Sequence, residues 1–202
     1  FEFDHFYSDH AFPQSLPLVF EHRPNHILDI GGNTGKWAVK CAEYDENVEV
    51  TIMDLPGQLD AAKENIAQTG LMNRIHFLEA NFLKSGTRFF DGADTLWMSQ
   101  FLDCFSQDEI LSILKQATQV MNKDSRLFIL ETFWDRQRYE AGSYCVNATS
   151  LYFTCMANGN SRMYHSKDMV RLIHKAGMYV EQDIDNLGVA HTLLHCRLRP
   201  AD

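Results

Sequence analysis

Short apolar runs alternate with amphipathic stretches along the first two thirds of the chain. Each run has the length and the β-branched or aromatic content of a buried strand, and they lie at 26–30, 48–53, 74–79, 94–99 and 126–131. Between them, apolar residues recur at helical spacing at 34–44, 58–69 and 107–121. This alternation predicts a parallel sheet covered by helices.

The last third of the chain has a different rhythm. Residues 147–157 are rich in aromatic residues and methionine, and we expect them to form a helix that packs into the core. A second helix follows at 166–176, with Ser166 as its N-cap. The final runs, 178–184 and 190–198, are joined by too few residues for a parallel crossover, so they should pair antiparallel.

Together these elements predict one α/β domain. Its sheet would be Rossmann-like, doubly wound, mostly parallel and seven-stranded, with an antiparallel last strand. We assign residues 1–202 to this domain, with residues 1–25 as a lead-in that covers one face of the core. Such sheets bind ligands beyond the carboxyl ends of their strands, so the residues that end the strands are the candidates for function.

Charge and composition argue against several classes of function. The net charge is −9 and no basic run occurs, which disfavours a nucleic-acid partner. No apolar run approaches the roughly 20 residues of a membrane helix. The five cysteines form no C-x-x-C pair, and the nine histidines form neither H-x-x-x-H nor H-E-x-x-H. We therefore expect reduced thiols, a cytoplasmic location and no metal site.

The stretch HILDIGGNTGKW places a glycine-rich turn between the first strand and the first of these helices. A phosphate-binding loop needs G-x-x-x-x-G-K-[ST] and a dinucleotide site needs G-x-G-x-x-G, and the turn matches neither. An acidic residue, a spacer and then G-x-G-x-G is the usual signature of S-adenosylmethionine binding. Asp29 with Gly31, Gly32 and Gly35 matches all but the central glycine. Asn33 takes that place, and asparagine is the commonest non-glycine residue at positive φ.

Residues that end the second and third strands extend this interpretation. Asp54 stands where an acidic residue would accept hydrogen bonds from both ribose hydroxyls, as it also would in NAD enzymes; a helix N-cap is the alternative role. Asn81 and Phe82 stand where an amide would meet the edge of the adenine and a ring its face. An ordinary polar turn with a buried phenylalanine is the alternative there.

Four stretches, in order, resemble a class I O-methyltransferase of the plant caffeate and hydroxyindole type, which also has bacterial members. They are LDIGGNTG, TIMDLPGQLDAAKENIAQTGLMNRIHFLEANFL, LDCFSQDEILSIL and RLFILETFW. The resemblance covers about residues 20–198, and its most specific element is Asp54-Leu55-Pro56. It implies contacts with S-adenosylmethionine, whose product is S-adenosylhomocysteine, from Gly31, Asp54, Leu55, Asn81 and Phe82. Ser99 stands where plant members have a lysine at this site.

The resemblance also has consequences for the whole protein. Members of this family carry an N-terminal helical dimerisation domain of winged-helix type, which this chain lacks. We therefore expect a truncated chain and a native homodimer formed through the missing domain. The expected partner besides the second subunit is a small-molecule acceptor.

The chain departs from the family at the catalytic residues. The family's catalytic base is a histidine after strand four, and the resemblance places Asp103 there and Cys104 at the following aspartate. Of the family's two supporting glutamates, Glu131 is retained and the other falls at Ser161. Cys104 is either a thiol that faces the acceptor or a small buried hydrophobic residue.

Three interpretations of this difference stay open. Asp103 is itself the base, its pKa raised in a site lined by Phe153 and Met156. Alternatively, the acceptor needs only in-line positioning, or the domain has lost catalysis and only binds cofactor or a metabolite. Asp103 as a solvated acid at a strand end is a further possibility. We expect a methyltransferase acting on a small aromatic or hydroxylated acceptor, with the non-catalytic domain as the alternative and an NAD oxidoreductase as the poorer match.

Overall fold

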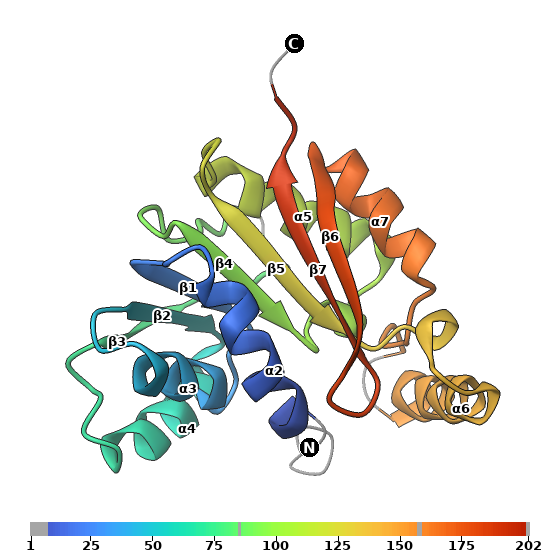
Figure 1. Ribbon diagram of the computed structural model, residues 1–202, viewed down its shortest axis with the longest axis horizontal. Coiled ribbons are helices and arrows are strands. Elements are labelled where there is room, and N and C mark those ends of the chain that lie inside the picture. The colour runs from blue at the N-terminus through green and yellow to red at the C-terminus, as the bar shows by residue number, and fades with distance from the viewer. Residues whose placement is uncertain (1–7, 85, 157–158, 201–202) are drawn as a thin grey trace.

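The computed structural model describes residues 8–84, 86–156 and 159–200. Its centre is a seven-stranded sheet with the order β3-β2-β1-β4-β5-β7-β6 (Figure 1). The strands are β1 (His26–Ile30), β2 (Glu49–Asp54), β3 (Ile75–Glu79), β4 (Thr95–Ser99), β5 (Arg126–Glu131), β6 (Met178–Leu187) and β7 (His191–Leu198). The first five pair in parallel, and β7 runs antiparallel to both of its neighbours. The predicted fold class is confirmed.

Helices cover both faces of the sheet. They are α2 (Ser8–Phe20), α3 (Lys36–Tyr44), α4 (Pro56–Ala67), α5 (Gln107–Val120), α6 (Glu140–Met156) and α7 (Ser166–Lys175), with short 3₁₀ turns η1 (Leu102–Cys104) and η2 (Trp134–Arg136). In Figure 1, α2 and α3 lie in front of the sheet, α5 lies behind it, and α6 stands apart from the sheet.

Side chains of the central strands point alternately to the two faces of the sheet, and each face has its own hydrophobic core. Ile27 packs with α2, α3 and α4, whereas its neighbour Leu28 packs with α5 and α7. Trp97 and Phe128 repeat the first orientation on β4 and β5. Because side chains alternate across a strand, a strand covered on both faces is predominantly apolar, as these runs are.

The lead-in is anchored by aromatic residues. Phe12 of α2 packs against Trp37 and Trp97 with ring centroids 5.2 and 6.3 Å apart. The two indole rings stack on each other at 3.8 Å and 11°. The expectation that this segment covers one face of the core is confirmed for its described part, and residues 1–7 lie outside the described residues.

Two local predictions were wrong. The N-cap of α7 is His165, whose Nδ1 accepts from the amide of Lys167, and Ser166 is the first helical residue. None of the residues of α6 is buried, although we expected 147–157 to pack into the core. Its apolar composition resembles that of a core helix, and composition does not reveal whether a second surface is present to cover it. Among the described residues, no helix is long and apolar enough to cross a membrane.

Candidate functional site

The strand order reverses between β1 and β4, and ligands of doubly wound sheets bind at this point. Here the glycine turn follows β1 and borders a cavity of about 30 Å³. The residues around it include Asp29 of β1, Gly31 and Gly32 of the turn and Ser99 at the end of β4. Ser8 and Phe12 of α2 also line it. A cavity of this size holds about one water molecule, so a larger ligand would have to extend over the surface beside it.

The turn depends on left-handed backbone at alternate positions. Gly31, Asn33 and Gly35 have φ of 74°, 48° and 76°. The expectation that Asn33 takes over the positive φ of the missing central glycine is confirmed. The amides of Gly31, Asn33 and Gly35 donate to the carbonyl of Met53, to Asp54 and to the carbonyl of Gly32. An anionic group such as a carboxylate would therefore have to accept from the amides between them.

The second and third glycines serve close packing. A Cβ on Gly32 would lie 2.6 Å from Oδ2 of Asp29, so the missing side chain leaves room for that carboxyl group. A Cβ on Gly35 would lie 2.8 Å from Cδ1 of Ile66 on α4. Gly35 therefore lets α3 and α4 approach each other, and its contact with a cofactor stays a prediction.

Asp29 is a buried carboxyl group at the floor of the site. It is 2% exposed, and within the described residues its Oδ2 has no hydrogen-bond partner. Burial, and then the negative charge of Asp54, raise its pKa to about 8. A buried, unsatisfied carboxyl oxygen beside a polar cavity would be stabilised by a cationic ligand group.

Asp54 ties the glycine turn to the end of β2. Its Oδ2 accepts from the amide of Asn33 at 2.9 Å and its Oδ1 from the amide of Leu55 at 2.7 Å. Burial raises its pKa, and these two amide bonds oppose the shift. A carboxylate has about four acceptor sites, so two remain that are able to accept the hydroxyls of a ribose.

The neighbouring candidates differ in exposure. Leu55 is 45% exposed and Asn81 is exposed, so both border the open surface next to the turn. The Oδ1 of Asn81 accepts from the amide of Leu83. Phe82 is buried, and its ring packs edge-on against Phe101 at 4.9 Å, which is the alternative that its sequence context left open. The cofactor contacts of these residues stay predictions.

The turn after β4 is held from inside the protein by Glu131. Its Oε1 accepts from the amides of Phe101 and Leu102 at 3.0 and 2.8 Å. Glu131 is 2% exposed; burial and then the charge of Asp103 raise its pKa, and the amide bonds oppose the shift. In this geometry Glu131 positions the turn.

The same turn is held from outside by the segment that follows α6. The amide of Arg162 donates to the carbonyl of Asp103 at 2.8 Å, and Tyr164 donates its hydroxyl to the carbonyl of Phe105 at 2.6 Å. Asp103 is half-buried, and its Oδ1 lies 3.6 Å from Sγ of the exposed Cys104. Asp103, Cys104 and Glu131 are thus brought together around η1, as the sequence predicted.

The predicted acceptor residues on α6 are more distant from this arrangement. Phe153 is half-buried and Met156 is 70% exposed. The helix joins the site through hydrogen bonds of Thr154 and Ser150, which contact the carbonyl of Ser161 and the amide of Met163. Contact of Phe153 or Met156 with an acceptor stays a prediction.

These features fit S-adenosylmethionine. The buried Asp29 oxygen suits its ammonium, the amides of the turn suit its carboxylate, and Asp54 retains acceptor sites for its ribose. Among the described residues, no group of His, Cys, Asp and Glu has an arrangement that would hold a metal ion.

Comparison with known proteins identifies the chain's family. The O-methyltransferase domain family matches residues 19–179. The chain belongs to the O-methyltransferase family. The resemblance seen in the sequence is thereby confirmed.

Among the relatives of this O-methyltransferase domain is mitomycin biosynthesis 6-O-methyltransferase of Streptomyces lavendulae, with 25% identity over 78% of this chain and 42% of the relative. Aclacinomycin 10-hydroxylase RdmB of Streptomyces purpurascens is 27% identical over 52% of this chain and 28% of its own. The solved structure of PigF with S-adenosylhomocysteine has the same fold, with a TM-score of 0.83, 17% identity and coverage of 97% of this chain and 57% of that one. The chain spans about half the length of the proteins it matches.

Some residues of the site carry no signal in the sequence. Ser8 and Phe12 line the cavity from the lead-in, and the amide of Arg162 donates to the carbonyl of Asp103 in η1. These three residues come from segments whose position depends on the tertiary fold.

Proposed function

We propose that this O-methyltransferase domain transfers a methyl group from S-adenosylmethionine to a small aromatic or hydroxylated acceptor. The observation that carries the proposal is the glycine turn, tied to Asp54 through the amide of Asn33 and floored by the unsatisfied carboxyl group of Asp29. Family membership and the S-adenosylhomocysteine named with PigF support the same cofactor. The name of the mitomycin relative supports a small-molecule acceptor.

In this proposal the chain's own residues hold the cofactor by its charged and polar groups. Asp29 would face the ammonium, the amide of Gly32 would face the carboxylate, and Asp54 would accept from the ribose. Leu55, Asn81, Phe82 and Ser99 would surround the adenosine and sulfonium ends. When bound, S-adenosylmethionine supplies an electrophilic methyl group on its sulfonium.

The acceptor would lie at η1, beyond the methyl group. Asp103 is the candidate base: its carboxylate would take the proton of the acceptor hydroxyl as that oxygen attacks the methyl carbon. Glu131 would keep Asp103 in place through the amides of Phe101 and Leu102. Cys104, Phe153 and Met156 would border the acceptor. An acceptor that is already ionised would need only positioning at this point.

For the whole protein, we propose a homodimer formed through an N-terminal domain outside this chain, with residues 1–202 as the methyltransferase domain. The unburied helix α6 supports the presence of a further covering surface. A cytoplasmic location is supported by the five cysteines, all of which are free thiols.

A methyl-transfer assay tests the proposal. The purified chain is incubated with isotopically labelled S-adenosylmethionine and a panel of small phenols, catechols and hydroxynaphthoates. Transfer should occur to at least one acceptor, and Asp103→Asn should lower turnover more than tenfold with the affinity for S-adenosylhomocysteine unchanged. Asp108→Asn, an exposed acid in the first turn of α5, is the matched control and should keep the wild-type rate.

A second candidate function is a non-catalytic binding domain. Its support is the departure from the family at Asp103 and Ser161. Cofactor binding without transfer to any member of the panel would favour it. Equal turnover by wild type and Asp103→Asn would instead retain the enzyme and remove Asp103 as the base.

A further inference from the structure

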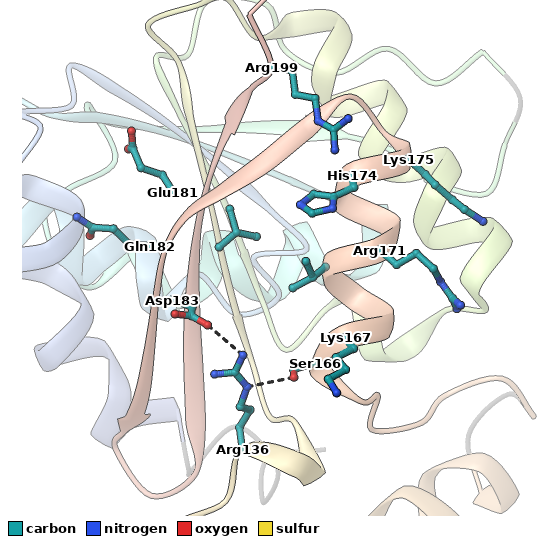
Figure 2. Close-up of a pocket in the computed structure, with 12 residues that line it drawn as sticks. Arg136, Ser166, Lys167, Arg171, His174, Lys175, Glu181, Gln182, Asp183 and Arg199 are labelled. Atoms are coloured by element: carbon teal, nitrogen blue, oxygen red, sulfur yellow. Dashed lines mark hydrogen bonds and ion pairs between the residues drawn. The ribbon is translucent and has the colours of Figure 1, made fainter.

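A groove of about 730 Å³ lies between α7 and β6, on the side of the molecule formed by the last strands. Figure 2 shows its arrangement: helix α7 forms one wall and strand β6 the other, Arg199 reaches in at one end, and Arg136 lies at the opposite end near Ser166 and Lys167. The middle of the groove contains the apolar side chains of Val170 and Val180. None of its lining residues borders the glycine turn or η1.

The groove is basic although the chain is acidic. Its lining includes five Lys or Arg residues and two Asp or Glu residues, in a chain of net charge −9. Both acids are already paired, and two of the cations, Arg136 and Arg171, also pair with Asp185 and Asp168, which do not line the groove. Asp183 lies 3.0 Å from Arg136, and Glu181 lies 3.3 Å from Arg197.

The cations of the groove are less compensated. Among the described residues, Lys167, Lys175 and Arg199 form no ion pair, and Arg199 donates only to the backbone carbonyls of β6 and its approach. An uncompensated cluster of cations on an acidic surface attracts an anionic partner and repels a cationic one.

The shape of the groove favours an extended chain. Strand β6 lies at the edge of the sheet, and within the described part of the chain only β7 pairs with it. An edge strand presents unpaired amide and carbonyl groups on its outer side, which an extended peptide is able to pair with. The apolar centre between two cationic ends matches a segment with acidic residues on both sides of a short β-forming stretch.

We propose that this groove binds an acidic, extended segment of a partner protein along the outer edge of β6. A second copy of this chain is a poor occupant, since a two-fold pairing of β6 with itself would bring Arg199 and Lys167 of both copies into one groove. A small anion would satisfy the cations without using the apolar floor or the strand edge.

Fluorescence anisotropy tests the proposal with a labelled peptide in which two glutamates flank Thr-Val-Thr-Val on each side. The acidic peptide should bind at least tenfold more tightly than its glutamine counterpart, and binding should weaken as salt rises. The double variant Lys167→Glu/Arg199→Glu should lose at least tenfold in affinity. Lys40→Glu/Lys63→Glu changes the net charge equally on α3 and α4 and should bind like wild type.

Other results would overturn the proposal. If wild type bound the acidic and the glutamine peptide with equal affinity, the groove would not be the site. The same would follow if the two double variants bound the acidic peptide with equal affinity. Binding of inorganic tripolyphosphate without binding of the acidic peptide would identify a small-anion site. A dimer in sedimentation that Lys167→Glu/Arg199→Glu dissociates would make a second copy the occupant. Unchanged affinity for a peptide N-methylated at alternate residues would exclude pairing with the strand edge.

Discussion

The ring of Phe101 occupies the space in which a side chain at Gly31 would stand. A Cβ at position 31 would come within 2.7 Å of Cγ of Phe101, and the backbone there has a φ of 74°. The amide of Phe101 in turn donates to Glu131, so the turn after β4 and the glycine turn are in direct contact. The first glycine of the motif thus has a packing role in addition to its conformational one.

Gly31→Ala should destabilise the protein by about 2 to 4 kcal/mol, because it combines a left-handed backbone with a collision against a buried ring. Unfolding in urea measures the loss. Gly57→Ala is the control: nothing lies within 4 Å of its Cβ, so that variant should be as stable as wild type or slightly more stable. Adding Phe101→Ala to Gly31→Ala should recover part of the loss. A Gly31→Ala protein as stable as Gly57→Ala would contradict this account.

The sequence predicted most of the fold because the central strands are covered on both faces. A strand buried on both faces reads as a continuous apolar run, and the runs at 26–30 and 126–131 coincide with β1 and β5. The helical spacing at 107–121 likewise coincides with α5, and in the structure a capping box of Ser106 and Glu109 begins this helix. The prediction that α6 packs into the core was wrong, because apolar composition leads to burial only if a surface exists to cover the helix.

The sequence predicted those residues of the site that lie in one motif. It did not predict the contacts that form between segments far apart in the chain. Asp29, Asp54 and Asn33 follow from the glycine turn and its spacing. The contact of Phe101 with Gly31, and the two-sided bracing of η1 by Glu131 and Arg162, depend on segments far apart in the chain. No periodicity or motif in a single sequence records such contacts.

Cofactor binding should release a proton from Asp29. Its pKa of about 8 keeps it protonated at pH 7, and the ammonium of the cofactor would favour the ionised form. Affinity for S-adenosylhomocysteine should therefore rise with pH and level off above about pH 8. Calorimetry at pH 7 in phosphate and in Tris, which differ in ionisation enthalpy, measures the released proton.

The variant Asp29→Asn separates this effect from other titrations. It should release no proton when the cofactor binds. Its binding heat, corrected only for the heat of dilution, should therefore be the same in phosphate and in Tris. Asp45→Asn, which changes a half-buried carboxyl group that accepts from the amide of Asn47, should behave like wild type. Equal heats for wild type in phosphate and Tris would mean that Asp29 is not the group that meets the ammonium.

His195 should make the protein sensitive to acid. It is 2% exposed and stacks on Phe128 at 4.6 Å; burial lowers its pKa to about 4, while Glu181 opposes the shift. Below pH 6.5 the unfolded chain takes up a proton that the folded one does not, so His195 costs stability as the pH falls from 6.5 toward 4. The cost reaches at most roughly 3 kcal/mol.

His195→Phe keeps the stacking and removes the titration. Its stability relative to wild type, from urea unfolding at pH 7, 5.5 and 4.5, should increase as the pH falls. The buried carboxyl groups change the free energy of unfolding in the opposite direction over the same pH range. Because both proteins contain them, their contribution cancels in the difference. His76→Phe, half-exposed on β3, is the control. A difference that does not change with pH would show that His195 titrates normally.

Glu131 should act through its hydrogen bonds rather than its charge. Glu131→Gln keeps an oxygen that accepts from Phe101 and Leu102, so its turnover should stay within about threefold of wild type. Glu131→Ala leaves two buried amides unpaired and should lose more than tenfold in turnover and about 1 to 3 kcal/mol in stability. Equal, large losses of turnover in both variants, with folding intact, would make the carboxylate itself catalytic.

The central claim is that the glycine turn and Asp54 hold S-adenosylmethionine, and calorimetric titration of the purified chain tests it most directly. S-adenosylmethionine and S-adenosylhomocysteine should bind with micromolar affinity and NAD should not bind, while Asp54→Ala should weaken S-adenosylhomocysteine by ~1.5 to 3 kcal/mol. Binding of NAD, or an affinity for S-adenosylhomocysteine that Asp54→Ala leaves unchanged, would contradict the account.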